Sequence, residues 1–391
     1  MKQGWEIKQL GEVVEVLDNL RKPITKRDRV EGDYPYYGAT GILSYVHNYI
    51  FSEKLVLIGE DGAKWLSGDN TSFIAKGEYW VNNHAHVIRP RRKIILDEWI
   101  VYFLNFSDLT PFITGMTVPK LNQEKMRSIP IPLAPLPEQQ RIVALLDETF
   151  AAIAKAKANA EQNLKNAKEL FESYLQGVFE NPKDNWEKKK WGDLCDFVRG
   201  PFGGSLKKNI FKEDGFVVYE QKHAIHDHFN QLRYFIDEDK FNEMIRFELK
   251  PGDIIMSCSG VTLGRVAIVP DGIKQGIINQ ALLKLTPKKN VSVHFIKHWL
   301  RSSIFQKIIF DFAGGAAIPN VPSAKILKDI LIPFPSLKEQ EKVVNDIELM
   351  LVETKRLEVI YQQKINDLEE LKKSVLQKAF SGELKTVKEV V

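Results

Sequence analysis

The chain contains 391 residues, of which 44% are hydrophobic and 27% charged, and it has a formal net charge of +4 at pH 7. This length is too great for one hydrophobic core and is typical of two domains with helical connectors. The composition is that of a soluble globular protein and excludes a disordered or fibrous chain, while the mild positive charge permits nucleic-acid binding without requiring it.

The sequence also limits where the protein works. No apolar run reaches the roughly 18 residues of a membrane-spanning helix, and residues 1–10 lack the apolar core of a signal peptide, so we expect a cytoplasmic protein. The only cysteines, Cys195 and Cys258, lie far apart in the chain, which excludes a disulfide framework and a cysteine-rich zinc cluster.

The first globular half, predicted at residues 1–135, has the short strands and frequent turns of a mixed α/β domain. Two aromatic strand-like runs flank the small residues of Tyr37–Gly41, which predicts a turn between strands. A buried strand is expected at Leu55–Gly59, ending in a Gly-Glu-Asp-Gly turn, and another around Asn82–His86. A helix-like stretch, Asp97–Asn105, precedes a proline-rich exit.

A long helix is predicted next, within residues 136–183. Apolar side chains recur every three or four residues from Val143 to Val178, and Lys157 is the interruption of this stripe. A proline in the first turn marks the start, and Asn181-Pro182 marks the end. A helix of about 44 residues spans about 65 Å, so its apolar stripe has to pack against another element.

The second globular half is predicted at residues 184–336. Its strands are expected in GDIIMSCSGVTLGRVAIV and GIINQALLKLTP, which aligns Asn83 loosely with Asn279. The small-residue turn of the first half has no counterpart in its sequence, and a helix-like stretch, Val293–Ile309, precedes its exit. A second long helix and a tail are predicted at residues 337–391.

The sequence repeats itself with a constant offset. IPLAPLPEQQRIV at residues 131–143 corresponds to IPFPSLKEQEKVV at residues 332–344, and the offset of 332 − 131 = 201 continues through both long helices. We therefore predict a mixed α+β fold with a pseudo-two-fold internal repeat, in which two antiparallel coiled-coil helices hold the globular halves at the ends of a rod. The alternative is that each helix packs on its own domain. A paired, approximately two-fold arrangement is typical of proteins that bind duplex DNA.

No catalytic constellation is recognisable in the sequence. There is no GxxxxGK[ST] phosphate loop and no Asn/Asp-Pro-Pro-Tyr tetrapeptide for adenine methylation, and Gly260–Gly264 is interpreted as a turn between strands. Glu60, Asp61 and Lys64 lack the spacing that would place two acids and a lysine on one strand face, as a nuclease site requires. We therefore expect the chain to carry no catalytic residue.

The histidine clusters are interpreted as core or DNA-proximal residues rather than as metal ligands. His84 and His86 alternate on one predicted strand and would share a face, and His223, His226 and His228 form a second cluster. No cysteine lies near either cluster to complete the usual ligand set of a zinc site.

Basic and small residues of the predicted loops are the candidate DNA contacts, the basic ones to phosphates and the small ones through close backbone approach to bases. Lys64 and Arg265 are the preferred candidates, because each follows a turn at the matching strand end of its own half. The full set is Arg21, Lys22, Lys26, Arg27, Tyr37, Gly38, Thr40, Lys64 and Arg89 in the first half, and Lys207, Lys208, Lys222, His223, Arg246 and Arg265 in the second.

The whole chain resembles the specificity (S) subunits of type I restriction-modification systems. The markers are YYGATGILSYV, VLIGEDGA and WVNNHAH in the first half, and GVTLGRVAIV, INQALLKL, IPFPSLKEQEKVV and VLQKAFSGEL in the second. The resemblance covers residues 1–385 and implies two target-recognition domains, each recognising one half of a split, asymmetric double-stranded DNA site. It also implies that the two helices act as a spacer and as the docking surface for two methylation (M) subunits.

The resemblance further implies that the chemistry belongs to partner subunits. S-adenosylmethionine, ATP and Mg are expected on those partners, which would methylate adenine at N6 and, with restriction (R) or motor subunits, cleave DNA. The alternative function is a coiled-coil scaffold whose two domains bind proteins or glycans. Salt dependence separates the two, because binding to duplex DNA weakens steeply as the salt concentration rises.

Overall fold

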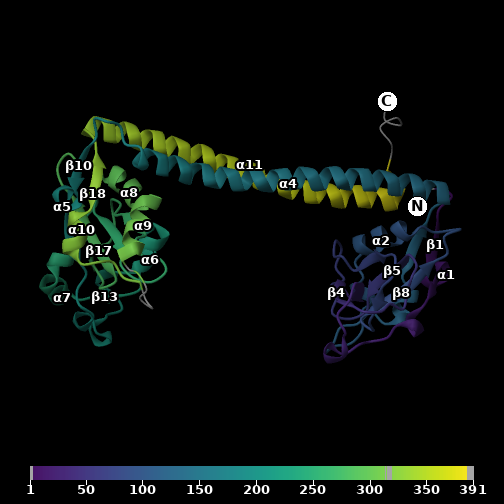
Figure 1. Cartoon of the computed structure of the whole chain (residues 1–391). Helices are drawn as coiled ribbons and strands as arrows, with labels where there is room; N and C mark the ends of the chain where they lie inside the picture. Colours follow the sequence, from purple (N-terminus) through teal and green to yellow (C-terminus); the bar gives the residue numbers. More distant parts are fainter. Residues whose placement is uncertain (1–2, 313, 315–318, 385–391) are drawn as a thin grey trace. The chain divides into compact units, whose positions relative to one another are not determined.

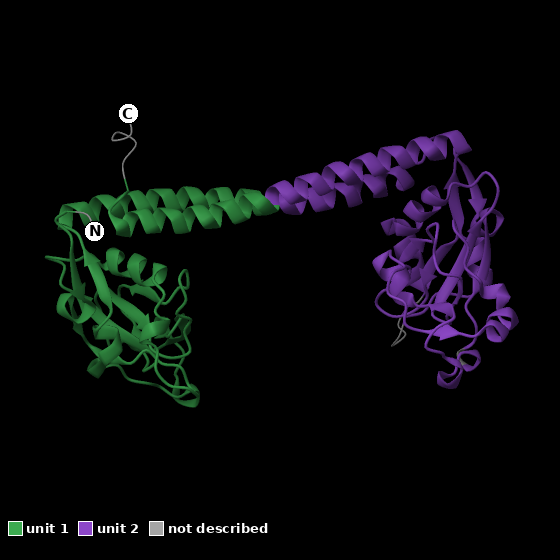
Figure 2. Cartoon of the chain, turned by 180° about the vertical axis from the view of Figure 1, so that it is seen from behind, with its two compact units in different colours: residues 1–161, 362–391 green, residues 162–361 purple. Residues whose placement is uncertain are grey.

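The computed structural model describes residues 3–312, 314 and 319–384 (Figure 1). The chain forms two compact units, which are coloured separately in Figure 2. Unit 1 comprises residues 1–161 and 362–391, and unit 2 comprises residues 162–361. In the described part of the chain, no helix combines the length and apolarity needed to cross a membrane.

Each unit contains a four-stranded antiparallel sheet, and the strand order is equivalent in the two units. The inner strands β5 and β14 are buried along their whole length, as their continuous apolar sequences predict. The sheet of unit 1 is β2 (Val14–Val16), β8 (Ala85–Pro90), β5 (Leu55–Gly59) and β6 (Ser72–Ala75). The sheet of unit 2 is β11 (Cys195–Arg199), β17 (Leu282–Pro287), β14 (Ile254–Ser257) and β15 (Val266–Ile268).

A three-stranded sheet accompanies the large sheet in each unit, and its middle strand pairs antiparallel on one side and parallel on the other. In unit 1 the order is β4 (Gly41–Val46), β3 (Tyr34–Gly38) and β7 (Trp80–Val81), which confirms the turn predicted between the two aromatic runs. In unit 2 the order is β13 (Phe235–Ile236), β12 (Phe216–Tyr219) and β16 (Gly276–Ile278). The predicted divergence at this turn is confirmed, because β12 leads into helix α6 (Gln221–His226) instead of a hairpin.

A two-stranded sheet leads into each long helix, and short helices cover the remaining surfaces. The strand pairs are β1 (Glu6–Gln9) with β9 (Pro130–Leu133) and β10 (Glu187–Lys190) with β18 (Leu331–Phe334). The short α-helices are α1 (Leu10–Val13), α2 (Asp97–Phe106) and α3 (Gln123–Arg127) in unit 1, and α5 (Trp191–Leu194), α7 (Glu238–Glu243), α8 (Val293–Arg301), α9 (Ser303–Phe312) and α10 (Ala324–Asp329) in unit 2.

The helix-like stretch predicted at Val293–Ile309 is two helices rather than one. Ser302 separates α8 from α9 because its backbone is extended, with φ −64° and ψ 149°. Its hydroxyl accepts a hydrogen bond from the Phe305 amide (3.4 Å) and thereby caps the second helix.

The long helices α4 (Leu136–Glu180) and α11 (Leu337–Ser381) pack antiparallel, as the repeat predicts. In unit 1 the early part of α4 meets the late part of α11, and Lys157 Nζ lies 2.6 Å from Glu369 Oε1. In unit 2 the late part of α4 meets the early part of α11 in the core that contains Leu175 and Ile347. The helices also pack on the domains, since Phe380 contacts Trp99 of α2 edge to face at 5.0 Å.

The strand predicted around Asn82–His86 is interrupted by a turn. Strand β7 ends at Val81, residues 82–84 form the turn, and β8 begins at Ala85. The prediction that His84 and His86 share a strand face is therefore wrong, because only His86 belongs to a strand.

The structural counterpart of Asn279 is Asn82, not Asn83. The Asn82 amide donates to the Tyr37 carbonyl (3.0 Å), and the Asn279 amide donates to the Tyr219 carbonyl (2.9 Å). Each Asn side chain then accepts a hydrogen bond from the backbone amide two residues later. In each unit the residue after this Asn is exposed in the shared turn; in unit 1 it is Asn83.

Candidate nucleic-acid interface

The strand directions bring loops from distant parts of the chain to one end of each unit. In unit 1 the Glu60 amide donates to the His84 carbonyl (2.9 Å) and the Leu121 amide donates to the Glu60 carbonyl (2.8 Å). In unit 2 the Cys258 amide and carbonyl make the same two bonds, to Ala281 and from Val321 (both 2.9 Å). We call these regions the loop ends; they comprise residues 18–21, 38–41, 60–64, 82–84 and 114–123 in unit 1, and 199–200, 220–222, 258–265, 279–281 and 319–321 in unit 2.

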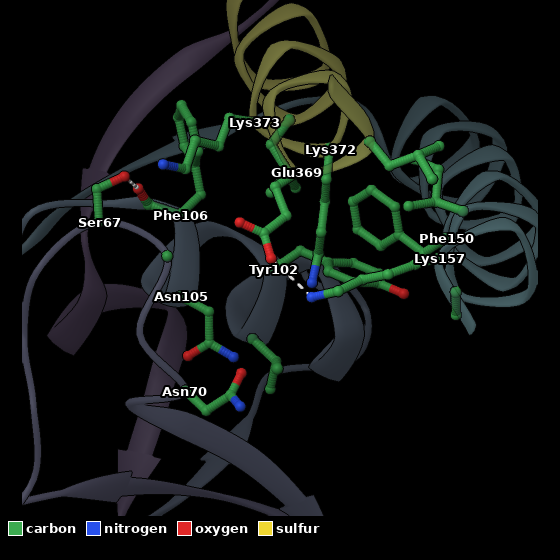
Figure 3. A pocket seen from close by; sticks show the side chains of 16 residues that line it. Ser67, Asn70, Tyr102, Asn105, Phe106, Phe150, Lys157, Glu369, Lys372 and Lys373 are labelled. Carbon is green, nitrogen blue, oxygen red and sulfur yellow. Dashed lines mark hydrogen bonds and ion pairs between the residues drawn. The ribbon is translucent and has the colours of Figure 1, made fainter. Parts of the chain in front are cut away.

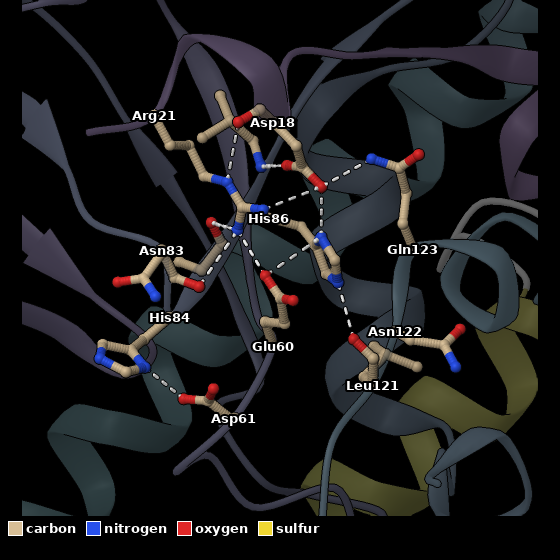
Figure 4. Close-up of polar contacts among 12 residues, drawn as sticks. Asp18, Arg21, Glu60, Asp61, Asn83, His84, His86, Leu121, Asn122 and Gln123 are labelled. Atoms are coloured by element: carbon tan, nitrogen blue, oxygen red, sulfur yellow. Dashed lines mark hydrogen bonds and ion pairs between the residues drawn. The ribbon is translucent and has the colours of Figure 1, made fainter. Parts of the chain in front are cut away.

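The loop end of unit 1 is held by ionised side chains (Figure 4). The Glu60 carboxylate accepts from Arg21 Nη1 at 2.5 Å and pairs with Lys120 Nζ at 2.7 Å. Both ring nitrogens of His86 lie within hydrogen-bond distance of oxygen atoms, the Asp18 carboxylate at 2.6 Å and the Leu121 carbonyl at 2.7 Å. We call Asp18, Arg21, Glu60, His86, Lys120 and Gln123 the charged network.

The surroundings keep both acids of the charged network ionised. Burial alone would raise the pKa of Asp18, but hydrogen bonds from His86, Gln123 and the Val87 amide hold it below its usual value. Burial likewise acts to raise the pKa of Glu60, and the Lys120 and Arg21 cations lower it by more. The network thus neutralises Arg21, which the sequence placed among the DNA contacts.

Unit 2 fills the equivalent positions with mainly neutral side chains. Cys258 is equivalent to Glu60 because both make the same two backbone hydrogen bonds, and Leu283 is equivalent to His86 because each pairs with the matching residue of the central strand. Both are buried. The Gln221 side-chain amide instead donates to Ser257 Oγ and to the Ser259 carbonyl, both at 2.6 Å.

A basic 3₁₀ turn occupies the same place in both units, between the first strand of the large sheet and the middle strand of the small sheet. It is η2 (Lys26–Asp28) in unit 1 and η5 (Lys208–Ile210) in unit 2. The cationic side chains exposed here are Lys26 and Arg27 in unit 1 and Lys207 and Lys208 in unit 2. Lys22 is exposed just before the first turn. The remaining 3₁₀ segments are η1 (Asp18–Leu20), η3 (Thr110–Phe112), η4 (Gly203–Ser205) and η6 (Ile245–Phe247).

The structure argues against four of the predicted DNA contacts. His223 is fully buried, and burial lowers its pKa, so it packs in the core. The Arg21 cation is paired within the charged network, and only 13% of its side chain is exposed. Arg89 lies at the opposite end of its sheet and pairs with Glu53 and Glu15, both at 2.6 Å. Arg246 is exposed in η6, which is not part of the loop end of unit 2.

Of the remaining candidates, the loop ends contain Gly38, Thr40, Lys64, Lys222 and Arg265, but Lys64 and Arg265 are not at matching positions as predicted. Tyr37 is half-buried, Gly38 is buried and Thr40 is exposed in the hairpin turn, while Lys222 is half-buried and pairs with Glu220. The Arg265 carbonyl accepts a hydrogen bond from the Ser257 amide (2.8 Å). The equivalent acceptor in unit 1 is the Thr71 carbonyl, so Arg265 corresponds to Thr71 and not to Lys64. Lys64 and Arg265 are both exposed at their loop ends, yet at different positions.

Sequence reasoning missed the segment that completes each loop end. Lys120 forms a bridge with Asp61, and Asn320 forms the matching bridge with Ser259. The signal was a second short repeat, TGMTVPK at residues 114–120 against GGAAIPN at residues 314–320, with an offset of 200. The predicted turn at Gly260–Gly264 is confirmed, with φ of +79° and +77° at its two glycines.

The described residues offer little for covalent or metal chemistry. Burial raises the pKa of the Cys195 and Cys258 thiols to about 12, so neither is a thiolate nucleophile near neutral pH. Within the ranges that the structure describes, no group of three or more His, Cys, Asp or Glu side chains is placed to hold a metal ion.

A cavity of about 490 Å³ lies away from the loop end, at the joint between α2 and the long helices of unit 1 (Figure 3). Lys157, Lys372 and Lys373 line it, and Lys157 pairs with Glu369. The Tyr102 hydroxyl donates to Asp147 across the same joint. Because the polar groups here bind one another, as Lys157–Glu369 and Tyr102–Asp147 do, we interpret the cavity as part of the packing between α2 and the long helices and not as a DNA-binding site.

Comparison with known proteins agrees with this architecture. The family described as type I restriction modification DNA specificity domain matches residues 2–165 and 183–369. A Haemophilus influenzae protein named as a type I restriction enzyme specificity subunit is 28% identical over 347 residues, which cover 88% of this chain and 86% of that protein.

Two solved structures share the fold at 19% sequence identity. One comes from work on complex assembly and conformational transition of a type I R-M system, with a TM-score of 0.71 over 98% of this chain and 99% of the other. The second is the HsdS subunit from Thermoanaerobacter tengcongensis, with a TM-score of 0.67 over 98% of each chain. The two domain matches, taken with the duplicated fold, show that this chain belongs to the family of type I restriction-modification DNA specificity subunits.

Proposed function

We propose that each domain of this specificity subunit recognises one half of a bipartite, asymmetric DNA site. The observation that carries the proposal is the pair of loop ends, which share backbone hydrogen bonds and differ in side chains. Equivalent frames position each domain in the same way, and different side chains give each a different base preference. The exposed basic 3₁₀ turns supply phosphate contacts beside both loop ends.

We further propose that two methylation subunits dock on the long helices. Apolar side chains stay exposed there, including Leu349 (65%), Val352 (61%) and Val359 (69%) on α11 and Leu170 (47%) on α4. Exposed apolar stripes of this kind mark protein interfaces. On this proposal the partners bind S-adenosylmethionine and methylate adenine at N6, restriction subunits with ATP and Mg cleave DNA, and the complex works in the cytoplasm.

A domain exchange tests the division of the DNA site. Residues 1–130 are replaced by the corresponding segment of a relative with a different target, and methylated adenines are mapped genome-wide. One half-site should change while the other persists. A matched exchange of residues 184–330 should change the other half instead. If either exchange altered both halves together, the domains would not act independently.

Salt dependence tests DNA binding itself against a scaffold role. The affinity of the assembled complex for duplex DNA should fall linearly on a log–log plot against salt, by about 0.9 per neutralised phosphate. Binding that ignored salt, or a complex without sequence-specific methylation, would contradict the proposed function.

A further inference from the structure

One hairpin at the loop end of unit 1, Thr114–Lys120, projects apolar side chains into solvent. Met116 is fully exposed (103%), and Val118 is 64% exposed. Large apolar side chains grouped at an exposed tip are uncommon unless they cover a partner surface.

The base of this hairpin is fixed to the sheet. The Thr114 and Lys120 backbones exchange two hydrogen bonds of 2.8 Å, and Lys120 Nζ pairs with Glu60 at 2.7 Å. Gly115 has φ +89°, and an added Cβ would lie 2.4 Å from the Val118 carbonyl oxygen, so the tight tip requires glycine. A rigid base under an exposed apolar tip is a preorganised contact element.

We propose that Met116 makes an apolar contact with the bases of the first DNA half-site and contributes to its sequence specificity. The inference rests on the proposed function and goes beyond it by naming a specificity-determining side chain. Duplex DNA is the favoured occupant because the exposed cation Lys64 lies at the same loop end, while Lys120 is held at the hairpin base by Glu60. A cation there contacts a phosphate, while an apolar side chain meets a thymine methyl group or a base step in the groove.

Unit 2 is expected to lack this contact. The bridges of Lys120 and Asn320 anchor the sequence alignment, and its offset of 320 − 120 = 200 makes Ala316 the counterpart of Met116 in the sequence. Ala316 lies outside the described residues. Its side chain is smaller than that of methionine, so the apolar contribution belongs to the first half-site.

The test compares Met116→Ala, Met116→Leu and Ile7→Ala in the full chain assembled with its methylation partners. Ile7 is the matched control, an apolar side chain 57% exposed on β1, away from the loop end. Methylated adenines are mapped, and affinity is measured on duplexes with every single base change in both half-sites. Met116→Ala should lower discrimination at one position of the first half-site by about tenfold. Met116→Leu should restore most of it, and Ile7→Ala should match the wild type.

Two results would overturn the inference: a Met116→Ala complex with unchanged discrimination at all positions, or one weakened equally on every sequence. Both differ from failure of the proposed function, in which the wild-type complex itself would show no bipartite methylation.

Discussion

The loop ends of the two units share backbone hydrogen bonds but are supported by different side chains. In unit 1 the segment after Lys120 is tied down by charged side chains, whereas in unit 2 the matching segment lies over Cys258 and Leu283. The backbone bonds to Leu121 and Val321 are nevertheless the same. The backbone thus positions the loops, and the side chains behind them are free to differ between domains that recognise different sequences.

The largest difference between the units should appear when the centre of each loop end is truncated. Glu60→Leu leaves Arg21 and Lys120 without their shared carboxylate, and should destabilise unit 1 by about 3 kcal/mol. Cys258→Ala removes one buried sulfur and should cost unit 2 about 1 kcal/mol. Hydrogen exchange of peptides from each unit of the full chain measures both. Equal, small effects would show that the charged network adds no stability.

The joints between the domains and the long helices should differ by less. The buried Gln139 side chain bonds to the Leu96 amide and to the Ile94 and Ala134 carbonyls, at 2.7 to 3.0 Å. Its equivalent Gln340 bonds to the Ser292 amide and the Pro335 carbonyl, both at 2.9 Å.

Replacing either glutamine by leucine leaves buried backbone groups unpaired, at about 1–3 kcal/mol for each mutation. Gln139→Leu should be the more destabilising, since it leaves one more buried backbone group without a hydrogen-bond partner. Protection of α2 and α8 peptides against hydrogen exchange reports the two joints separately. A larger loss in Gln340→Leu would contradict the ranking.

Acid should weaken the two units in different pH ranges. Burial lowers the pKa of His298 and His223 in unit 2, so the unfolded chain takes up protons first and stability falls as the pH drops below about 6.5. In unit 1 the pKa values of Asp18 and Glu60 are lowered, so their contribution persists until the pH falls through about 4.

A swap variant sharpens this comparison. His298 bonds to Glu348 at 2.8 Å where unit 1 has Tyr102 bonded to Asp147. His298→Tyr should therefore reduce the loss of protection in unit 2 between pH 7.5 and pH 5, with the part due to His223 remaining. Hydrogen exchange corrected for its intrinsic pH dependence provides the measurement. Acid sensitivity that began in unit 1 would show the assignment to be wrong.

The smallest effects should come from the basic 3₁₀ turns. Lys26→Ala and Lys208→Ala should each weaken duplex binding nearly uniformly across sequences and reduce the salt slope by about one. Lys93→Ala and Lys289→Ala, exposed at the far ends of the sheets, are the matched controls. A change in base preference, rather than in salt slope, would mean that the turns contact bases.

The sequence was informative where one local pattern decides the structure. The long helices follow from apolar side chains that recur every three or four residues, and the hairpin at Tyr37–Gly41 follows from small residues between aromatic runs. The whole-chain resemblance identified the family because its markers are spread over both halves.

Positions that depend on contacts across the fold could not be predicted in this way. A cation in a loop has the same sequence signature whether it faces solvent, as Lys26 does, or a buried acid, as Arg21 does. Glu60 lies 39 residues from Arg21 along the chain, so only the closed sheet shows them as partners. His223 was misplaced for the same reason, because its burial depends on packing against Tyr219 and Phe229.

The units are nested along the chain, and this has a consequence for synthesis. Unit 2 is one continuous segment, residues 162–361, whereas the core of unit 1 includes Leu376, Ala379 and Phe380 from the end of α11. Phe380 packs on Trp99, and the two residues are 281 positions apart in the chain (380 − 99). During translation the first domain therefore leaves the ribosome early, but its core stays incomplete until the end of α11 has been synthesised. Unit 2 has every segment it needs sooner, although it is translated later. The domain made first is therefore the last to be finished, and during this interval its unpaired α4 is exposed to chaperones or to partner subunits.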